Sequence, residues 1–313
     1  EDPNMTVRIR ACWALANLFD VLALLVEGGT GTKIDAGQSI SVSLFQNIVR
    51  TGVKAAQDSD KVRASAMRLL GNAMRWRPND TEMLQMVAAA VNSNIHVNNA
   101  KVQWNACYAA ASLLLHSRRS ESEGEEAWKI QMLKLLTREV KDCKNFKVRI
   151  NAALALSMPE NRLDYGSEYV AVWEGVMRSV ERLDEMEEFS ELRYRETLSA
   201  QLVDTLCHLI VVATRGDFTP LKDLLFAQAE ALYHLLEARL KGEKKAPPSG
   251  TSTQTPAELQ LDEGGACFAV PLKTSSVDSL TAFVALTKLY ESHIKTIPLS
   301  TLQKFQSRAF PEE

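Results

Sequence analysis

A glycine-rich stretch that ends in lysine is the first place where the sequence could bind a small ligand. In "GGTGTK", which runs from Gly28 to Lys33, backbone N–H groups could wrap a phosphate. A phosphate-binding loop needs the spacing G-x-x-x-x-G-K-[ST] between a strand and a helix, and neither condition is met here. We therefore interpret the stretch as a loop, and we expect no nucleotide and no other cofactor.

Histidine and cysteine side chains could hold a metal or act as nucleophiles. The five histidines show no H-E-x-x-H pattern, and Cys207 and His208, being adjacent on a helix, point about 100° apart and cannot share an ion. The five cysteines form no C-x-x-C pair, and Cys12 and Cys107 stand at equivalent places in a repeated segment. These features predict reduced core thiols in a cytoplasmic or nuclear protein without a metal site.

Two acidic clusters bring carboxylates close together in the sequence, "ESEGEE" at 121–126 and "ERLDEMEEFSE" at 181–191. Paired carboxylates do acid–base work where a pocket separates their pKa values, but both clusters lie in expected turns between helices. Solvated surface charge is their predicted role. Ser120 and Ser122, in the context "RRSESEGEE", and Thr255, before a proline, are candidate phosphorylation sites.

Trp13 and Asn17 are the strongest candidates for contact with a partner. They stand four residues apart on a helix and more than about 120° from its apolar stripe. In the next copy of the segment Asn72 repeats the asparagine, and Arg68 takes the place of the tryptophan. Asparagine amides can pair with the backbone of an extended peptide. Two interpretations stay open: the four residues line a peptide groove, or Trp13 packs on a neighbouring helix or on a repeat further upstream.

These residues belong to a segment that recurs along the chain. Its copies are "NMTVRIRACWALAN", "DSDKVRASAMRLLGN", "NNAKVQWNACYAAAS" and "NFKVRINAALALSM". Alignment places Val7, Val62, Val102 and Val148 in one column, with alanine four residues later and an apolar residue eight residues later. At about 100° per residue these positions fall in one stripe, so each copy is predicted to be an amphipathic helix. A weaker fifth copy occupies 194–202.

Further stretches with helical periodicity lie between the copies, and the spacing predicts the fold. The valines are separated by 55, 40 and 46 residues, and helix-pair repeats have periods of about 40–47 residues. A glycine-rich insertion, 27–38, accounts for the long first interval. Two helices per repeat, stacked on their neighbours, bury what neither buries alone. The expected partner helices are 39–57, 81–91, 126–140 and 165–185, followed by a helix over 220–240.

The stretch "EDPNMTVRIRACWALANL" resembles the turn and second helix of a HEAT repeat, in which a turn Asp or Asn precedes V-R-x-x-A-x-x-x-L. The resemblance covers residues 1–240 and implies an all-α, right-handed α-solenoid of HEAT or armadillo-like helix pairs. It also implies a ladder of hydrogen bonds between turn acids and helix arginines. The matching pairs are Asp2 with Arg8, Asp58 or Asp60 with Arg63, and Asp142 with Arg149, whereas the third copy has Gln103 and a turn with Asn98 and Asn99.

Three regions are predicted along the chain. Residues 1–240 form the solenoid, with about five repeats of which the first is incomplete. Residues 241–275, rich in Pro, Gly, Ser and Thr, form a disordered linker, and 276–313 form a C-terminal helical cap. Because the chain opens with Glu inside the first copy, we expect it to be part of a longer protein.

Composition and resemblance together favour a binding function. The 313 residues carry a net charge of −3 and no run of about 18 apolar residues, so neither nucleic acid nor a membrane is an expected partner. We predict a scaffold or adaptor that presents a concave surface to a protein or an extended peptide, with upstream repeats of the same chain as further contacts. The stretch "CWALAN" also resembles the W-x-x-x-N helices of armadillo importins, which makes a cargo carrier the alternative. An enzyme is the least favoured class.

Overall fold

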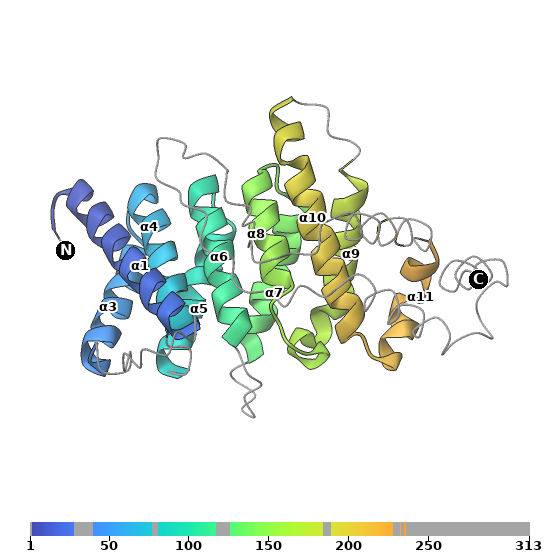
Figure 1. Ribbon diagram of the computed structural model, residues 1–313, viewed down its shortest axis with the longest axis horizontal. Helices are drawn as coiled ribbons and strands as arrows, with labels where there is room; N and C mark the ends of the chain where they lie inside the picture. Colours follow the sequence, from blue (N-terminus) through green and yellow to red (C-terminus); the bar gives the residue numbers. More distant parts are fainter. Residues whose placement is uncertain are drawn as a thin grey trace, which may run out of the picture. The chain divides into compact units, whose positions relative to one another are not determined.

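The computed structural model describes residues 2–27, 40–76, 81–116, 126–183 and 189–227, together with Leu232 and Leu235. The regular structure in these ranges is entirely helical, which confirms the predicted all-α class (Figure 1). The α-helices are α1 (Met5–Glu27), α3 (Val42–Ala55), α4 (Asp60–Trp76), α5 (Thr81–Ile95), α6 (Ala100–His116), α7 (Glu126–Asp142), α8 (Phe146–Leu156), α9 (Tyr169–Glu181), α10 (Phe189–Val212) and α11 (Phe218–Ala227). The 3-10 turns are η1 (Arg162–Glu168) and η2 (Arg215–Asp217).

The helices pack in the order of the sequence and form two rows of neighbours. The first row holds helices of the repeated segment: α1 packs on α4, α4 on α6, and α6 on α8. The second row holds the intervening helices: α3 packs on α5, α5 on α7, and α7 on α9. The pairs α3–α4, α5–α6 and α7–α8 join the two rows (Figure 1). In the first row, α4 and α6 therefore each pack on the helix of the preceding copy and on that of the following copy.

Capping side chains set where two of the helices begin. The Ser41 hydroxyl accepts a hydrogen bond from the N–H of Leu44 at 3.2 Å, so α3 begins later than the predicted residue 39. Asn145 caps α8 in the same way, because its side-chain oxygen accepts from the N–H of Val148 at 3.2 Å.

The helix predicted over 165–185 is wrong at its start. Residues 162–168 form the η1 turn, and α9 begins only at Tyr169. The break lies at Gly166, whose φ of 51° is a left-handed conformation that interrupts an α-helix and suits glycine. The apolar residues on both sides keep helical spacing, which is why periodicity alone did not indicate the break.

The aligned apolar columns form the core in three of the copies. Val62, Val102 and Val148 are fully buried, and so are the alanines four residues after them. The first copy differs, because Val7 is 46% exposed and Ala11 is exposed as well. The same sequence pattern is therefore core in α4, α6 and α8 and surface in α1, since no helix among the described residues covers that side of α1.

Small residues allow α4 and α6 to approach each other closely. A Cβ atom added to Gly71 would lie 2.9 Å from the Cα of Ala109, a distance that packed atoms do not tolerate. Ala109 is itself fully buried. The two helices can therefore pack closely because Gly71 and Ala109 lack bulky side chains.

The described residues belong to two compact units that divide inside α10, one ending at Leu202 and the other beginning at Val203. The second unit includes η2 and α11. There, the Asp217 carboxylate accepts hydrogen bonds from the N–H and the hydroxyl of Thr214 at 2.9 and 2.7 Å.

No single helix in the described ranges is long and apolar enough to cross a membrane, although 194–212 and 215–221 meet the length and composition requirement as a bent pair. The glycine-rich stretch, the predicted linker and the predicted cap lie outside the described residues. The same is true of Ser120, Ser122 and Thr255.

Candidate partner-binding surface

Polar side chains at the start of each copy of the segment contact neighbouring helices, beginning with Arg8. Its guanidinium donates two hydrogen bonds to the carboxylate of Asp58, in the second copy, at 2.7 and 3.1 Å. It donates a third to the backbone carbonyl of Asp2 at 2.7 Å. The predicted contact between Asp2 and Arg8 is therefore made through the main chain, and the side-chain pair runs to the following copy.

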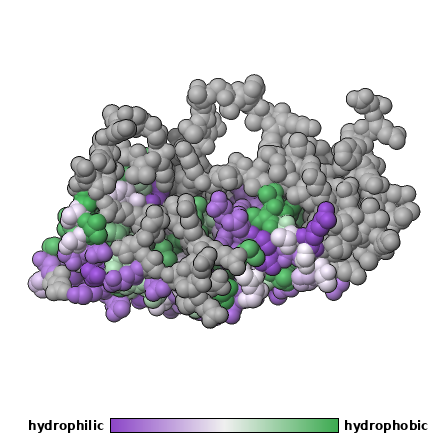
Figure 2. Space-filling view, turned by 90° about the horizontal axis from the view of Figure 1, so that it is seen from below, coloured by the Kyte–Doolittle hydropathy of each residue, from purple (hydrophilic) through white to green (hydrophobic). Residues whose placement is uncertain are grey.

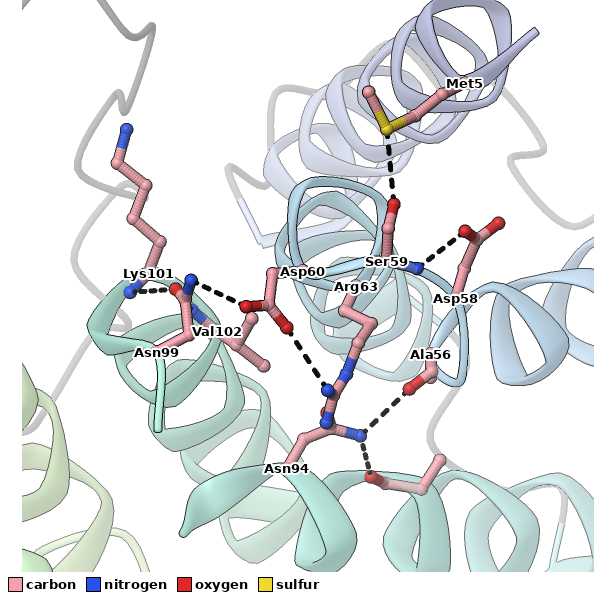
Figure 3. A network of polar contacts seen from close by, with 11 residues as sticks. Met5, Ala56, Asp58, Ser59, Asp60, Arg63, Asn94, Asn99, Lys101 and Val102 are labelled. Atoms are coloured by element: carbon pink, nitrogen blue, oxygen red, sulfur yellow. Dashed lines mark hydrogen bonds and ion pairs between the residues drawn. The ribbon is translucent and has the colours of Figure 1, made fainter. Parts of the chain in front are cut away.

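Arg63, in the second copy, connects α4 to α5 (Figure 3). It donates to the side-chain oxygen of Asn94 at 3.0 and 2.7 Å and pairs with Asp60 at 3.3 Å. Asp60 also accepts a hydrogen bond from Asn99, in the third copy, at 3.0 Å. Of its two predicted partners, Arg63 thus takes Asp60.

In the third copy Gln103 stands where the other copies have an arginine, and it contacts Glu139 of α7. Its Nε2 donates to one carboxylate oxygen of Glu139 at 3.2 Å, and Nδ1 of His96 lies 2.5 Å from the other. Glu139 is only 3% exposed. A buried carboxylate from α7 therefore takes the place of the turn acid, which the sequence pattern did not indicate.

The contacts of Arg149, in the fourth copy, contradict the prediction that this arginine pairs with Asp142. The buried Arg149 guanidinium donates to the carbonyl of Val140 at 3.2 Å and to the carbonyl and hydroxyl of Ser179 at 3.1 and 2.7 Å. Asp142 lies near the Lys141 ammonium instead, at 3.5 Å. Val140 and Ser179 stand in the last turns of α7 and α9, where unpaired carbonyls attract a cation.

The contact between Arg8 and Asp58 favours the charged form of both groups. Hydrogen bonds from Arg8, and a further one from the N–H of Ser59 at 2.6 Å, lower the pKa of the Asp58 carboxyl to about 2. The same contact raises the pKa of Arg8. Both groups therefore stay charged at neutral pH, although their partial exposure to water limits what the pair contributes to stability.

The structure brings Trp13 to the surface and places two of its predicted companions inside. The Trp13 side chain is 42% exposed, and Asn17 is half-buried. Arg68 and Asn72 are buried. The four residues therefore do not share one exposed groove.

Asn72 connects three helices of the first row. Its amide nitrogen donates to the carbonyl of Ala16 in α1 at 2.8 Å, and its oxygen accepts from the hydroxyl of Tyr108 in α6 at 3.0 Å. The donor and the acceptor that the sequence analysis offered to a peptide are thus both used inside the protein.

Two of the residues equivalent to Trp13 contact the preceding helix. Arg68 and Tyr108 stand, like Trp13, six residues after the column valine. Arg68 lies 3.9 Å from Asp20 of α1, and Tyr108 donates to Asn72 of α4. Trp13 occupies the same register position in α1 and is exposed.

Apolar side chains gather on the surface where α1 and α3 lie. Figure 2 shows hydrophobic residues exposed at that end, on the left of the view. Contiguous exposed apolar surface in a soluble protein commonly marks an interaction site. The large exposed apolar residues of the two helices are Met5, Val7, Trp13, Leu18, Val21, Leu24, Val42 and Leu44.

A second surface, which the sequence analysis missed, crosses α4, α6 and α8. The signal was the pattern K-V-x-x-[S/N], present as "KVRAS", "KVQWN" and "KVRIN". Apolar periodicity carries no information about the polar residues beside the apolar columns. Figure 3 shows the Lys101 side chain extending away from its helix. We name this surface the lysine row, and its members are Lys61, Lys101 and Lys147 with Ser65, Asn105 and Asn151.

The cysteines lie as free thiols in the described part of the chain. Burial raises the pKa of Cys12 and raises that of Cys107 well above its usual range, so both stay protonated at neutral pH. Cys143 and Cys207 likewise form no disulfide within the described ranges. Among the described residues, no three His, Cys, Asp or Glu side chains are grouped so that they could hold a metal ion.

Comparison with known proteins finds similarity to an uncharacterized protein. No family model matches the sequence, and no solved structure matches it. Over 123 residues the chain is 36% identical to an uncharacterized protein of Dictyostelium discoideum. The match covers 36% of this chain and 8% of that relative, so the chain is similar to a small part of a much longer protein.

Proposed function

We propose that the chain is a protein-binding scaffold or adaptor, built as a right-handed α-solenoid of the HEAT or armadillo kind. The observation that carries this proposal is the packing of equivalent helices in chain order, α1 on α4, α4 on α6 and α6 on α8. Stacked repeats of this kind present extended surfaces on which equivalent positions line up. The first row would carry the binding surface, and a protein segment would be the partner.

Equivalent polar side chains along the first row support this proposal. Ser65, Asn105 and Asn151 each donate a hydrogen bond to the carbonyl four residues earlier in the same helix, at 3.4, 2.7 and 2.7 Å. These bonds hold the three side chains in similar orientations. A segment that crosses the row would meet the same kind of group at each helix.

The apolar face of α1 would be covered by a preceding repeat of the same chain. The register position of Trp13 supports this part of the proposal, because the equivalent residues Arg68 and Tyr108 contact the preceding helix. The exposure of Val7 agrees with this, because its equivalents in the other copies are buried. The free thiols support a cytoplasmic or nuclear location, and we propose neither an enzymatic activity nor a cofactor.

The alternative is a cargo carrier that binds peptides through Trp13 and Asn17. The 42% exposure of the Trp13 side chain supports this alternative, because a bound peptide could cover it. For such a carrier, Trp13→Ala would weaken capture of a partner about tenfold or more at an unchanged melting temperature, as loss of a tryptophan anchor does. If Trp13 instead docks a preceding repeat, the same change would leave capture intact and reduce self-association of the purified chain.

Affinity capture from cell extract with matched surface variants tests the scaffold function. Asn105→Arg with Asn151→Arg adds two cations at half-buried positions of the first row, and Asn47→Arg with Gln131→Arg adds the same charge at exposed positions of the second row. We expect the first variant to lose proteins that the parent and the second variant retain, with all three melting alike. Identical capture by both variants would contradict the proposal.

A further inference from the structure

We propose that the guanidinium of Arg68 binds a carboxylate, which is the side chain of an Asp or Glu in a segment of a partner protein. This inference rests on the proposed scaffold function and specifies the chemistry of the partner at one point of the first row. It starts from an arginine of α4 that is only 9% exposed and whose Nε has no hydrogen-bond partner in the described part of the chain.

Part of the hydrogen-bonding capacity of the Arg68 side chain is unused in the folded protein. A guanidinium carries five N–H donors and keeps its positive charge in proteins. The Nε atom of Arg68 is enclosed, and none of the described residues accepts a hydrogen bond from it. A buried donor without a partner costs free energy, and the cost is larger for a charged group. Such a group in a native fold requires an explanation.

The Asp20 carboxylate of α1 does not supply the missing partner. Its Oδ2 lies 3.9 Å from Nη2 of Arg68, which is too far for a hydrogen bond. Its Oδ1 accepts a hydrogen bond from Nη1 of Arg75 at 3.3 Å. The Arg75 side chain is fully enclosed, whereas the Arg68 side chain keeps 11% of its surface exposed. A ligand can therefore reach the Arg68 side chain but not that of Arg75.

Other arginines of the first row have their acceptors inside the chain. Arg63 donates two hydrogen bonds to an asparagine of α5. The buried Arg149 donates to the backbone carbonyls of Val140 and Ser179. No residue in the described ranges does the same for Nε of Arg68. This contrast favours a partner molecule as the source of the acceptor for Arg68.

A second unpaired polar group occurs at the same register of the neighbouring helix. Arg68 and Asn72 stand six and ten residues after their column valine, and Tyr108 and Ser112 stand at the same two positions in α6. The helices α4 and α6 pack on each other (Figure 1). The Ser112 hydroxyl is buried and has no hydrogen-bond partner among the described residues. This register of the first row therefore contains two enclosed polar groups that the described part of the chain leaves unpaired.

A carboxylate suits Arg68 better than the other common acceptors. Its two oxygens match the planar fork of a guanidinium, and its single negative charge compensates the cation. A backbone carbonyl would leave the charge of Arg68 uncompensated. A phosphate group carries close to two negative charges at neutral pH, so the Asp20 carboxylate, 3.9 Å from the guanidinium, would repel it more strongly. An Asp or Glu side chain of a protein segment supplies the favoured group.

NMR spectroscopy of the full chain, with nitrogen-15 in its arginines, tests the inference because each Nε–H group gives its own signal. The Arg68 signal is identified by its absence from the spectrum of Arg68→Met. The probe is N-acetylglutamate N-methylamide, and the corresponding glutamine compound is its neutral control. The titration extends to about 100 mM, since a single ion pair binds weakly. We expect the Arg68 signal to shift with the glutamate compound and to stay in place with the glutamine compound.

Three variants separate a binding role of Arg68 from a structural one. Asp20→Asn removes the competing carboxylate, so the affinity for the glutamate compound should rise severalfold. Arg68→Met replaces an unpaired cation by an apolar side chain of similar length, so its melting temperature should equal or exceed that of the parent. Arg138→Met, at an exposed site of α7, is the matched control and should leave the titration of the Arg68 signal unchanged.

Several outcomes would overturn the inference. These are an Arg68 signal that does not move, one that moves equally with both compounds, and one that moves no more than the signal of the exposed Arg138. Tighter binding of the corresponding phosphoserine compound would also overturn it, as would weaker binding by Asp20→Asn. A melting temperature of Arg68→Met well below that of the parent would show that contacts within the chain hold the guanidinium, with the same consequence. If the capture experiment succeeds and the Arg68 signal stays fixed, the acidic partner is ruled out and the scaffold function stands.

Discussion

The carboxylate of Asp58 and the guanidinium of Arg8 form a two-point ion pair across the first junction, with nitrogen–oxygen distances of 2.7 and 3.1 Å. The matched planar groups fix the turn before α4 against the first turn of α1. The pair therefore connects two copies of the repeated segment that stand 50 residues apart.

Removing the Asp58 charge should make the free energy of unfolding depend less on pH in the acidic range. The folded pKa of about 2 lies below the unfolded value of about 3.9, so the pair stabilises the fold above pH 4 and loses that effect as pH falls from about 4 to 2. We expect the urea midpoint of Asp58→Asn to lie below that of the parent at pH 7, and the difference to shrink below pH 4. A difference that stays constant down to pH 2 would contradict the assignment.

Burial at one register position can be tested with a matched pair of substitutions. Ala106 and Ala11 are equivalent in the sequence repeat, but Ala106 is fully buried and Ala11 is exposed. Ala106→Asp should cost several kcal/mol or prevent folding, because it places an unpaired charge between packed helices. Ala11→Asp should change the free energy of unfolding by less than about 0.5 kcal/mol. Chemical denaturation of both variants provides the measurement, and similar losses would argue against the helix packing described.

The close approach of α4 and α6 should make Gly71 intolerant of a methyl group. Its added Cβ would meet backbone and side-chain atoms of Ala109 at 2.9 and 3.1 Å, so Gly71→Ala should destabilise by about 1–3 kcal/mol. Gly52 is the control, because its Cβ would meet the Cδ2 atom at the end of the Leu70 side chain. Gly52→Ala should be near neutral, since alanine favours the helix by about 1 kcal/mol. The order of the two melting temperatures checks the prediction.

Asn72 should matter for stability and not only for binding. Asn72→Ala leaves the Ala16 carbonyl and the Tyr108 hydroxyl without their partner, and unsatisfied buried groups of this kind cost about 1–3 kcal/mol in total. Asn105→Ala, at a half-buried site whose amide bonds only within its own helix, should cost less than about 0.5 kcal/mol. Equilibrium unfolding in urea compares the two. An unchanged midpoint for Asn72→Ala would show that its hydrogen bonds do not stabilise the junction.

The positions of the helices could be predicted from the sequence, but the partners of several polar side chains could not. The column of Val62, Val102 and Val148 indicated correctly which side of each helix is apolar, because that information lies within one segment of the chain. The partner of Arg149 was wrong, because the carbonyls that it binds come from the ends of two other helices. Gln103 shows the same limit, since its acceptor Glu139 stands 36 residues away.

By itself, the sequence determined the all-α class, the register of the repeated segment and the apolar stripe of each copy, since helical periodicity is a local property. Only the tertiary structure decided which of those stripes is covered: Ala106 lies between packed helices, and Ala11 faces solvent. It also placed Asn72 inside the first row and left Lys61 and Lys101 on its surface. The physical reason is that burial depends on neighbours supplied by distant segments, and one copy of a repeat carries no record of whether such a neighbour is present.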